Sequence, residues 1–451
     1  MVSRLADRIC VLARRLLEPP TAKLPALAHV LHFNTSLELS SSYDMPFLQR
    51  SLGLLPGLLA AASGLLLVGL TSALPPVLDL RPALLCASAL ASLGFVADLR
   101  RPAGRIRRAL TGWLALALAG TALTAAYDLT LAYRTQEVSF DNGGVTLRGT
   151  LYLPPRTGRY PAVVLVHGAG RSPRGESRFY ARAYARRGIA ALAYDKRGSG
   201  ESSGSLADAT YQELGNDAAQ AVERLRRHPE VDPQRVGLRG LSEGEWTGTI
   251  AALKAQAAFL VIVSGAATTP AEQVTYETAA RVRQAGYGEA AARRAGNLYR
   301  QISAFQRQGE GREALNRQLE QARSEPWFET AWYLEPSVPE YSRVLQLPWF
   351  AGWRARMDFD ALPLLAELRC PVLVQEGGID PKMDGPAALE RMRRALEGGG
   401  NHAFTGLLYP RATHNIIEWR LPWHLPPPWF AAHYLDDQLG WVALQVGVRR
   451  R

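Results

Sequence analysis

After residue 134, short apolar runs alternate with amphipathic segments, and this alternation constrains the fold more than any other feature of the sequence. The amphipathic segments at 211–228 and 386–399 have helical periodicity. Apolar strands that alternate with helices form a mostly parallel sheet with right-handed connections. We therefore expect an α/β domain over residues 135–451. Its candidate strands are residues 162–168, 189–195, 235–240, 258–265, 371–378 and 406–410.

Two segments of this domain depart from the alternation. In residues 137–154, apolar and polar residues alternate on both sides of an Asn-Gly-Gly sequence, which predicts a β-hairpin. Residues 266–360 contain charged helical stretches and many aromatic residues, but no convincing strand. Because this insertion is too long for a simple loop, we expect a helical lid over the carboxyl edge of the sheet. The aromatic residues, which we expect to form the core of the lid, are Trp327, Phe328, Trp332, Tyr333, Trp349, Phe350 and Trp353.

The first 134 residues contain long uncharged stretches. Residues 51–78 are uncharged over 28 positions, residues 82–97 over 16 and residues 109–127 over 19. A membrane-spanning helix needs about 20 apolar residues, so the first and third stretches are long enough and the second is marginal. The alternatives are buried helices of a soluble domain, or a signal peptide in place of the first stretch. We expect an α-helical transmembrane region with helices at about 51–75, 82–98 and 109–131.

Basic residues flank these stretches and contribute much of the net charge of +11. Thirteen Lys or Arg stand against seven Asp or Glu in residues 1–134. The arginine-rich segment 98–108 is expected in the cytoplasm by the positive-inside rule, which puts the α/β domain on the outer side of the cytoplasmic membrane. We therefore expect a lipid bilayer as partner, and no nucleic acid. A start at Met45 is an alternative to a start at Met1.

The pattern Gly-x-Ser-x-Gly, typical of a hydrolase nucleophile elbow, occurs twice, around Ser202 and around Ser242. Catalytic residues of an α/β sheet lie just after the carboxyl ends of strands. Ser242 directly follows the strand at 235–240 and precedes a plausible helix, whose N-terminus favours developing negative charge. Ser202 lies in a Gly-rich loop, and no helix begins directly behind it. We predict Ser242 as the nucleophile and Ser202 as a loop residue.

A nucleophilic serine needs a histidine base, which follows the serine in chain order in this type of sheet. His414 lies just past the carboxyl end of the strand at 406–410 and is the candidate base. His402 precedes that strand, at the opposite end of the sheet. His424 and His433 lie in a Pro- and Trp-rich tail and are expected to be structural, as is His167, which precedes the serine.

The base needs an acid, and acyl transfer needs two N–H donors for the oxyanion. Asp380, in the loop after the strand at 371–378, is the candidate acid, with Asp384 one helical turn further as its rival. The expected oxyanion donors are the backbone N–H groups of Glu243 and Ala169. Such a site needs no metal or organic cofactor. The widely spaced Cys10, Cys86 and Cys370 predict neither a disulfide framework nor a structural zinc site.

In this order, the segments VVLVHGAG, AYDKRGSGES, GLSEG, PVLVQEGGID and THN resemble the α/β-hydrolase superfamily. They are most similar to its bacterial carboxylesterase and serine-aminopeptidase-like branch, over about residues 137–440. The resemblance implies Ser242 as nucleophile, Asp380 as acid and His414 as base. It also implies Ala169 and Glu243 as oxyanion donors, and it assigns residues 195–198 to a structural loop near the site.

Two features depart from this branch. Glu245 stands where glycine is common; an acid in the first turn suits the helix dipole but would narrow the site. The acid loop at 377–384 is also looser than the usual form. The sequence predicts a membrane-anchored serine hydrolase that cleaves carboxylic esters of small or lipid-like acyl groups. A serine-aminopeptidase-like peptidase, a thioesterase, an acyltransferase and a non-catalytic membrane-tethered binding module remain alternatives, and the oligomeric state stays open.

Overall fold

A computed structural model describes residues 133–331, 333–334, 348–418 and 429–448. Its main sheet has eight strands in the order β1-β2-β4-β3-β5-β6-β7-β8. From β4 to β8 all neighbours are parallel, whereas β2 is antiparallel to both β1 and β4. This is the expected α/β-hydrolase arrangement. The strands are β1 (Arg134–Asn142), β2 (Val145–Leu153), β3 (Tyr160–Val166), β4 (Ala190–Tyr194), β5 (Val231–Leu241), β6 (Leu260–Val263), β7 (Val372–Gly377) and β8 (Phe404–Tyr409).

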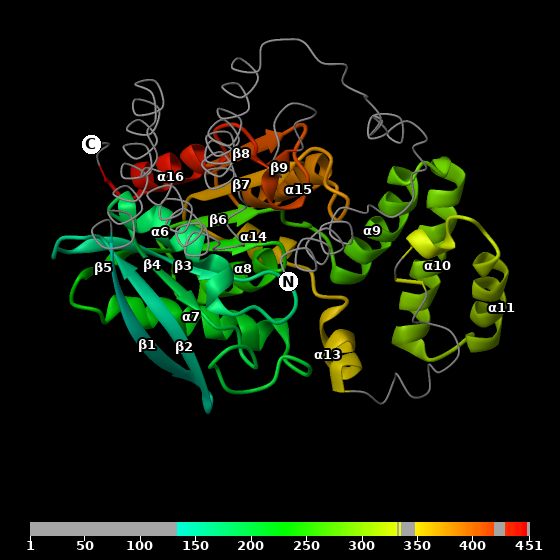
Figure 1. Cartoon of the computed structure of the whole chain (residues 1–451), viewed down its shortest axis with the longest axis horizontal. Coiled ribbons are helices and arrows are strands. Elements are labelled where there is room, and N and C mark those ends of the chain that lie inside the picture. The colour runs from blue at the N-terminus through cyan, green and yellow to red at the C-terminus, as the bar shows by residue number, and fades with distance from the viewer. Residues whose placement is uncertain (1–132, 332, 335–347, 419–428, 449–451) are drawn as a thin grey trace, which may run out of the picture. The chain divides into compact units, whose positions relative to one another are not determined.

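The predicted hairpin is β1–β2, at one end of the sheet (Figure 1). Its two-residue loop is Gly143-Gly144, and both glycines have positive φ, of 57° and 85°. Two-residue hairpin loops of this kind match the twist of the strands, and glycine adopts their backbone conformation without steric cost. The Asn-Gly-Gly sequence therefore identified the turn correctly.

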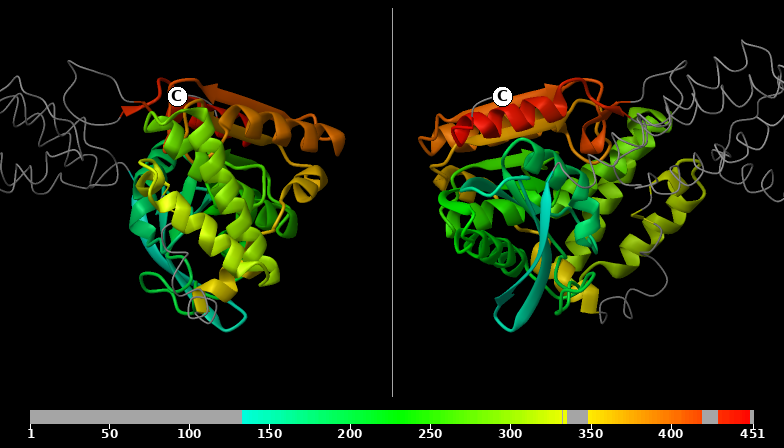
Figure 2. Two further views of the ribbon diagram at one scale, coloured as in Figure 1. Left: turned by 90° about the vertical axis from the view of Figure 1, so that its right-hand side faces the viewer. Right: turned by 60° about the vertical axis from the view of Figure 1, so that its left-hand side comes forward.

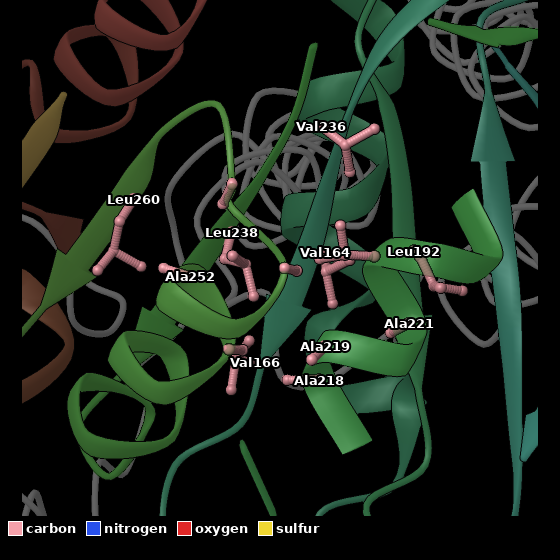
Figure 3. Packing of buried hydrophobic residues seen from close by; sticks show 14 of the residues in the cluster. Val164, Val166, Leu192, Ala218, Ala219, Ala221, Val236, Leu238, Ala252 and Leu260 are labelled. Atoms are coloured by element: carbon pink, nitrogen blue, oxygen red, sulfur yellow. The ribbon is translucent and has the colours of Figure 1, made fainter. Parts of the chain in front are cut away.

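Helices cover both faces of the sheet, so the domain has three layers (Figure 1). The alternation of side chains along a strand explains this arrangement. On β3, Val164 and Val166 pack with α7 and α8, whereas Val163 and Leu165 pack in the cluster that contains α6 and α16. Figure 3 shows the first of these two cores, with small alanines of α7 facing the valines and leucines of the strands. The covering helices are α6 (Arg178–Arg186), α7 (Tyr211–Arg226), α8 (Gly244–Lys254), α14 (Leu362–Glu367), α15 (Gly385–Gly398) and α16 (Tyr434–Gln445).

The predicted helical insertion lies between β6 and β7 (Figures 1 and 2). Its helices have a hydrophobic cluster of their own, to which Trp327 and Phe328 contribute as buried residues. Tyr333 and Trp353 pack against this cluster, so these four aromatics serve the core of the insertion, as expected. Trp332 and the side chains of Trp349 and Phe350 lie outside the described part of the chain. The helices are α9 (Pro270–Gln284), α10 (Gly288–Gln308), α11 (Arg312–Arg323) and α13 (Pro348–Arg356).

The three stretches expected to cross a membrane, between residues 51 and 131, lie outside the described residues. Among the residues that are described, none of the helices combines the length and the apolar character needed to cross a bilayer. The membrane region therefore stays a prediction from the sequence.

Candidate active site

Ser242 lies in a sharp turn between the end of β5 and the start of α8. Its φ is 55°, a left-handed backbone conformation that non-glycine residues adopt rarely and at an energetic cost. The turn is held from the neighbouring strand, because the Ser242 N–H donates to the Val263 carbonyl over 2.9 Å. The predicted strand–turn–helix context of this serine is thus observed, with the strain expected of a nucleophile elbow.

The elbow also depends on glycine at position 240. A Cβ at Gly240 would lie 2.1 Å from the carbonyl oxygen of Gly244, far closer than atoms can approach. At Gly248, in the interior of α8, an added Cβ would make only ordinary contacts, the nearest at 3.6 Å to Leu260.

We expect Gly240→Ala to lower the free energy of unfolding by roughly 3 kcal/mol, because the clash is with backbone and cannot relax by a rotamer change. Gly248→Ala is the matched control. It should stabilise the protein by up to about 1 kcal/mol, because alanine has the higher helix propensity. Thermal unfolding followed by circular dichroism measures both changes. Equal melting temperatures for the two variants would show that a Cβ at position 240 does not clash with the Gly244 carbonyl.

Asp380 and His414 form a hydrogen-bonded pair. The Nδ1 atom of His414 lies 2.7 Å from Oδ2 of Asp380, whose side chain is fully buried. The second oxygen of Asp380, Oδ1, accepts from the Lys382 N–H over 2.8 Å, which fixes the carboxylate in its loop. With Nδ1 bound in this way, Nε2 is the ring nitrogen left to exchange a proton with a substrate or a nucleophile.

Asp384, the rival acid, has a different role. It is the N-cap of α15, and its side chain accepts from the Ala387 N–H over 3.2 Å. A cap of this kind stabilises the helix. The structure therefore places Asp380, and not Asp384, beside the histidine.

The three candidate residues leave the sheet at the same edge. The parallel strands pair Leu241 with Val263, Val263 with Gln375 and Gln375 with Leu407. Ser242 follows β5 immediately, whereas Asp380 and His414 lie in the loops after β7 and β8. Carboxyl ends of parallel strands are where ligands meet such sheets. His402, by contrast, precedes β8, at the opposite edge, as expected.

The two segments expected to donate to an oxyanion contact each other. A Cβ at Gly168 would lie 3.6 Å from the Ser242 Cβ, and one at Gly244 would lie 3.1 Å from the His167 carbonyl. The turn after β3, which carries Ala169, thus packs against the elbow. Glu243 precedes the first turn of α8, so its N–H is one of the donors that a helix start leaves without an intrahelical acceptor.

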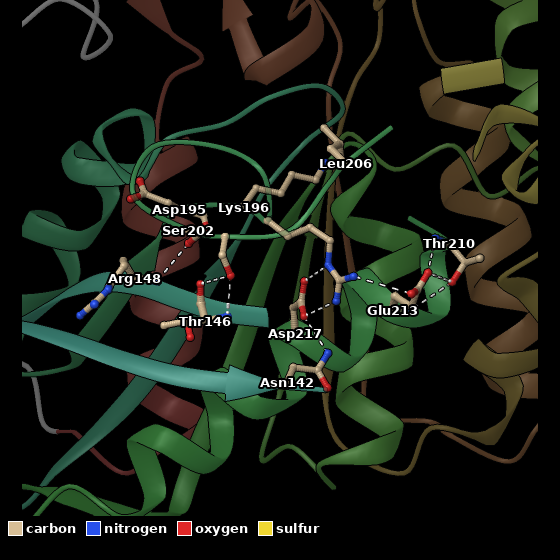
Figure 4. Close-up of polar contacts among 12 residues, drawn as sticks. Asn142, Thr146, Arg148, Asp195, Lys196, Ser202, Leu206, Thr210, Glu213 and Asp217 are labelled. Atoms are coloured by element: carbon tan, nitrogen blue, oxygen red, sulfur yellow. Dashed lines mark hydrogen bonds and ion pairs between the residues drawn. The ribbon is translucent and has the colours of Figure 1, made fainter. Parts of the chain in front are cut away.

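Ser202 has two structural hydrogen bonds. Its hydroxyl donates to the Asp195 carbonyl over 2.7 Å and accepts from the Arg148 N–H over 2.9 Å, which ties the glycine-rich loop to β2 (Figure 4). In the same loop, Arg197 binds the buried Asp217 of α7 through two of its nitrogens. This agrees with the expectation that residues 195–198 form a structural loop near the site.

The remaining histidines also have structural environments where they are described. Burial and the nearby Lys196 lower the pKa of His167 to about 3, so this ring is neutral, and its Nε2 lies against the Tyr194 carbonyl. His433 is the N-cap of α16, with a positive φ of 66°. His424 lies outside the described residues. None of the described residues form a cluster of three or more His, Cys, Asp or Glu that could hold a metal ion.

Glu245, the unusual acid after the elbow, is fully buried in the structure. Its carboxylate accepts from the N–H groups of Ala266 and Ala267, in the loop that follows β6. A second buried acid, Glu376 on β7, accepts from the Gly265 N–H over 2.8 Å in the same loop. Glu245 therefore holds this loop in place through hydrogen bonds. The sequence alone did not reveal that Glu376 binds the same loop.

Burial raises the pKa of both acids. The pKa of Glu245 rises from 4.5 to about 7, with the bonds from Ala267 and Ala266 opposing the shift, and that of Glu376 rises well above its ordinary value. A folded-state pKa above the unfolded one favours the protonated form. The resulting stability is therefore fully present below pH 4.5 and is lost as the pH rises through about 7.

We expect the contribution of Glu245 to stability to fall by roughly 2 kcal/mol between pH 5.5 and pH 8.5. Glu245→Gln should remove this part of the pH dependence, because the amide stays neutral and keeps an acceptor for the Ala266 N–H. Glu390→Gln, on the exposed side of α15, is the control and should leave the slope unchanged. Denaturant unfolding at the two pH values measures the effect. A slope in Glu245→Gln as steep as in the wild type would contradict it.

The family profile of the X-Pro dipeptidyl-peptidases (S15 family) matches residues 143–391. The uncharacterized protein PA2218 of Pseudomonas aeruginosa is 33% identical over 119 residues, and the thiohydrolase aneE of Aspergillus aculeatus is 36% identical over 100 residues. These alignments cover 26% and 22% of this chain, and only 32% and 31% of the two relatives.

Solved structures resemble the chain at low sequence identity. The crystal structure of PA2218 from Pseudomonas aeruginosa is 20% identical, with a TM-score of 0.44 over 70% of this chain and 95% of that one. The esterase PF2001 of Pyrococcus furiosus is 14% identical, with a TM-score of 0.44 over 71% and 92% of the two chains. The family profile, in contrast, matches more than half of the chain and includes the nucleophile elbow. The chain is therefore an α/β hydrolase that belongs to the X-Pro dipeptidyl-peptidase (S15) family.

Proposed function

We propose that the protein is a serine hydrolase that cleaves carboxylic esters through an acyl-enzyme intermediate. The observation that supports this most strongly is the Asp380–His414 hydrogen bond at the sheet edge where the strained Ser242 also lies. An acid that orients a histidine, at the same sheet edge as a serine held in a strained turn, is the arrangement that activates a hydroxyl group.

In the proposed mechanism, the Ser242 hydroxyl attacks the ester carbonyl carbon while Nε2 of His414 takes its proton. The N–H groups of Ala169 and Glu243 stabilise the oxyanion that forms. His414 then returns the proton to the leaving alcohol, and the acyl group remains on the serine. A water molecule, deprotonated by His414, hydrolyses the acyl-enzyme. Asp380 stays ionised throughout and keeps the imidazole in the productive orientation.

The substrate expected from the sequence is a small or lipid-like acyl ester. Ile379, directly before Asp380, is 53% exposed and presents apolar surface next to the acid–base pair. The aromatic residues of the insertion give this substrate class little support, because Trp327 and Phe328 are buried in the insertion's own core. Closure of this insertion over the site, as a lid, remains part of the proposal.

A second candidate is cleavage of X-Pro dipeptides from peptide N-termini, which the family match favours. Peptides and esters are attacked by the same serine, so the choice depends on the leaving group and on recognition of the N-terminal amine. Thioester hydrolysis is a third possibility, favoured by the similarity to a thiohydrolase. Rates on a p-nitrophenyl ester, an acyl thioester and an alanyl-proline anilide would rank the three.

Reaction with a fluorophosphonate probe tests the serine-hydrolase proposal itself. The folded protein should be labelled, and mass spectrometry of the digested product should place the label on the peptide that contains Ser242. Heat-denatured protein is the control, since the reaction requires the folded triad. Absence of labelling would refute the proposal and leave the non-catalytic binding module as the better interpretation. A label on another serine would refute the assignment of Ser242 as the nucleophile.

We also propose that the N-terminal third anchors the enzyme in the cytoplasmic membrane with the hydrolase domain outside. The uncharged stretches between residues 51 and 127 and the arginines of 98–108 support this topology. Protease added to intact cells should then digest the domain after residue 134. Full protection of that domain, with digestion only after lysis, would contradict the outward placement.

A further inference from the structure

Lys196 reaches from the loop after β4 into the interior, where it contacts both segments of the expected oxyanion hole. Its Nζ donates to the Gly168 carbonyl over 2.9 Å and to Oε1 of the Glu243 carboxylate. Both side chains are buried, with 5% of Lys196 and 8% of Glu243 exposed. A buried ion pair is costly unless its geometry is good, so its location next to the nucleophile calls for an explanation.

One partner of Lys196 adjoins an expected oxyanion donor, and the other partner is itself a donor residue. Gly168 precedes Ala169, and its carbonyl belongs to the peptide bond that carries the Ala169 N–H. Glu243 itself carries the other expected donor N–H. One ammonium group therefore binds the carbonyl oxygen of the peptide bond that carries the Ala169 N–H. It also binds the side chain of Glu243, whose backbone supplies the other N–H.

The rest of the loop is connected elsewhere. Asp195 binds Arg174, Arg197 binds Asp217 of α7, and Ser202 binds the backbone of β2. These contacts fix the loop to α7, to β2 and to Arg174. Lys196 then connects this fixed loop to the two segments of the expected oxyanion hole. A lysine suits this task because its ammonium group has three donors and can serve two acceptors that lie in different directions.

We propose that Lys196 is a positioning residue, which holds the turn at 167–170 and the elbow at the separation that an oxyanion requires. The inference rests on the proposed serine-hydrolase function. Without the lysine, no side chain of the described residues joins the turn at 167–170 to Glu243, and the turn can shift relative to the elbow. The distance between the Ala169 and Glu243 N–H groups then changes. A displacement of about 1 Å in a preorganised site lowers the rate on the order of 10²-fold.

The test compares replacements of two buried ion pairs on the same loop. Lys196→Met alone would leave the Glu243 carboxylate buried without its partner and destabilise the fold. The informative variant is therefore the double replacement Lys196→Met/Glu243→Leu, which removes both charges together. The matched control is Arg197→Met/Asp217→Leu, which removes the neighbouring ion pair, whose other polar partners are Asn142 and Glu213 and not the turn at 167–170.

Two kinetic quantities distinguish positioning from simple stabilisation: kcat on an ester substrate, and Ki for a trifluoromethyl ketone. The ketone accepts the Ser242 oxygen at its carbonyl carbon, the serine proton passes to His414, and the ketone oxygen becomes an oxyanion in the same hole. We expect the Lys196/Glu243 double replacement to lower kcat by about 10²-fold and to raise Ki for the ketone by about 10²-fold, with KM nearly unchanged. The control should lose thermal stability but keep both values.

The proposal is overturned if the folded Lys196/Glu243 variant retains wild-type kcat and Ki, or if the control pair lowers them equally. Those outcomes leave the serine-hydrolase function intact, because the wild type would still turn over ester and bind the ketone. A wild-type enzyme that neither hydrolyses ester nor binds the ketone would refute the hydrolase proposal, and the role of Lys196 with it.

Discussion

Replacing Ser242 by alanine should lower kcat for ester hydrolysis on the order of 10⁴–10⁶-fold. The reason is chemical, since the variant has no nucleophile that could form the acyl-enzyme, and any remaining rate must come from water. The oxyanion donors and substrate contacts stay in place, so KM should change little. The fold should also persist, because the N–H of residue 242 still donates to the Val263 carbonyl. Steady-state kinetics with a p-nitrophenyl ester measure the change.

Ser202→Ala is the matched control, because Ser202 lies in the other Gly-x-Ser-x-Gly match. Its hydroxyl bridges the Asp195 carbonyl and the Arg148 N–H, so its removal leaves two backbone groups without this partner. We expect a loss of roughly 1–3 kcal/mol in stability and an unchanged kcat. If Ser242→Ala kept a substantial part of the activity while Ser202→Ala lost it, the assignment of the nucleophile would be reversed.

The second large effect is expected at the acid: Asp380→Asn should lower kcat by about 10⁴-fold. Oδ2 of Asp380 accepts from Nδ1 of His414 over 2.7 Å in a fully buried environment. An asparagine that turns its amide nitrogen toward the ring would favour the tautomer with its proton on Nε2. That nitrogen then cannot accept the proton of Ser242. The negative charge that stabilises the imidazolium in the transition state is lost as well.

Asp384→Asn is the control for this variant and also tests the alternative acid. Asn and Asp are about equally good helix N-caps, so α15 should keep its stability. Because Asp384 caps the helix through the Ala387 N–H, its charge is not needed by His414, and kcat should stay at the wild-type value. We would measure kcat of both variants over pH 5–9. A kcat that is low at every pH means that the histidine no longer acts as a base, whereas a displaced pH profile means that it still acts as a base but over another pH range. A large rate loss in Asp384→Asn with a small one in Asp380→Asn would exchange the two assignments.

Local sequence patterns were sufficient for the fold of the α/β domain. The alternating hairpin strands, the apolar runs, the amphipathic helices and the Gly-Gly turn have local causes, and the predicted helices 211–228 and 386–399 agree with α7 and α15 within two residues. The strand of Ser242 was the least complete prediction, because β5 begins at Val231 and not at residue 235. Residues 232–235 are polar or proline, and this segment joins the strand because Val231 before it pairs with Tyr160 of β3.

The candidate triad shows where sequence information ends. Chain order and strand ends selected Ser242, His414 and Asp380, with Asp384 as a rival acid because it lies further from the strand end. The fold decides between the two aspartates, because it points Asp380 at the imidazole and places Asp384 at the start of a helix. A side chain's direction depends on the turn that carries it. This turn is held by hydrogen bonds from the Gly378 and Ile379 N–H groups to the carbonyls of Tyr409 in β8 and Ala412 after it.

The chain by itself therefore determined the α/β-hydrolase sheet, the elbow at Ser242 and the order of the triad candidates, because these depend on periodicity and on residues adjacent in sequence. Tertiary structure alone decided what the buried charges do. Glu245 meets the loop after β6, and Lys196 joins Gly168 to Glu243 across two strands of the sheet. Such pairs join residues far apart in the chain, and burial makes each charge depend on its partner for stability, which no local pattern encodes.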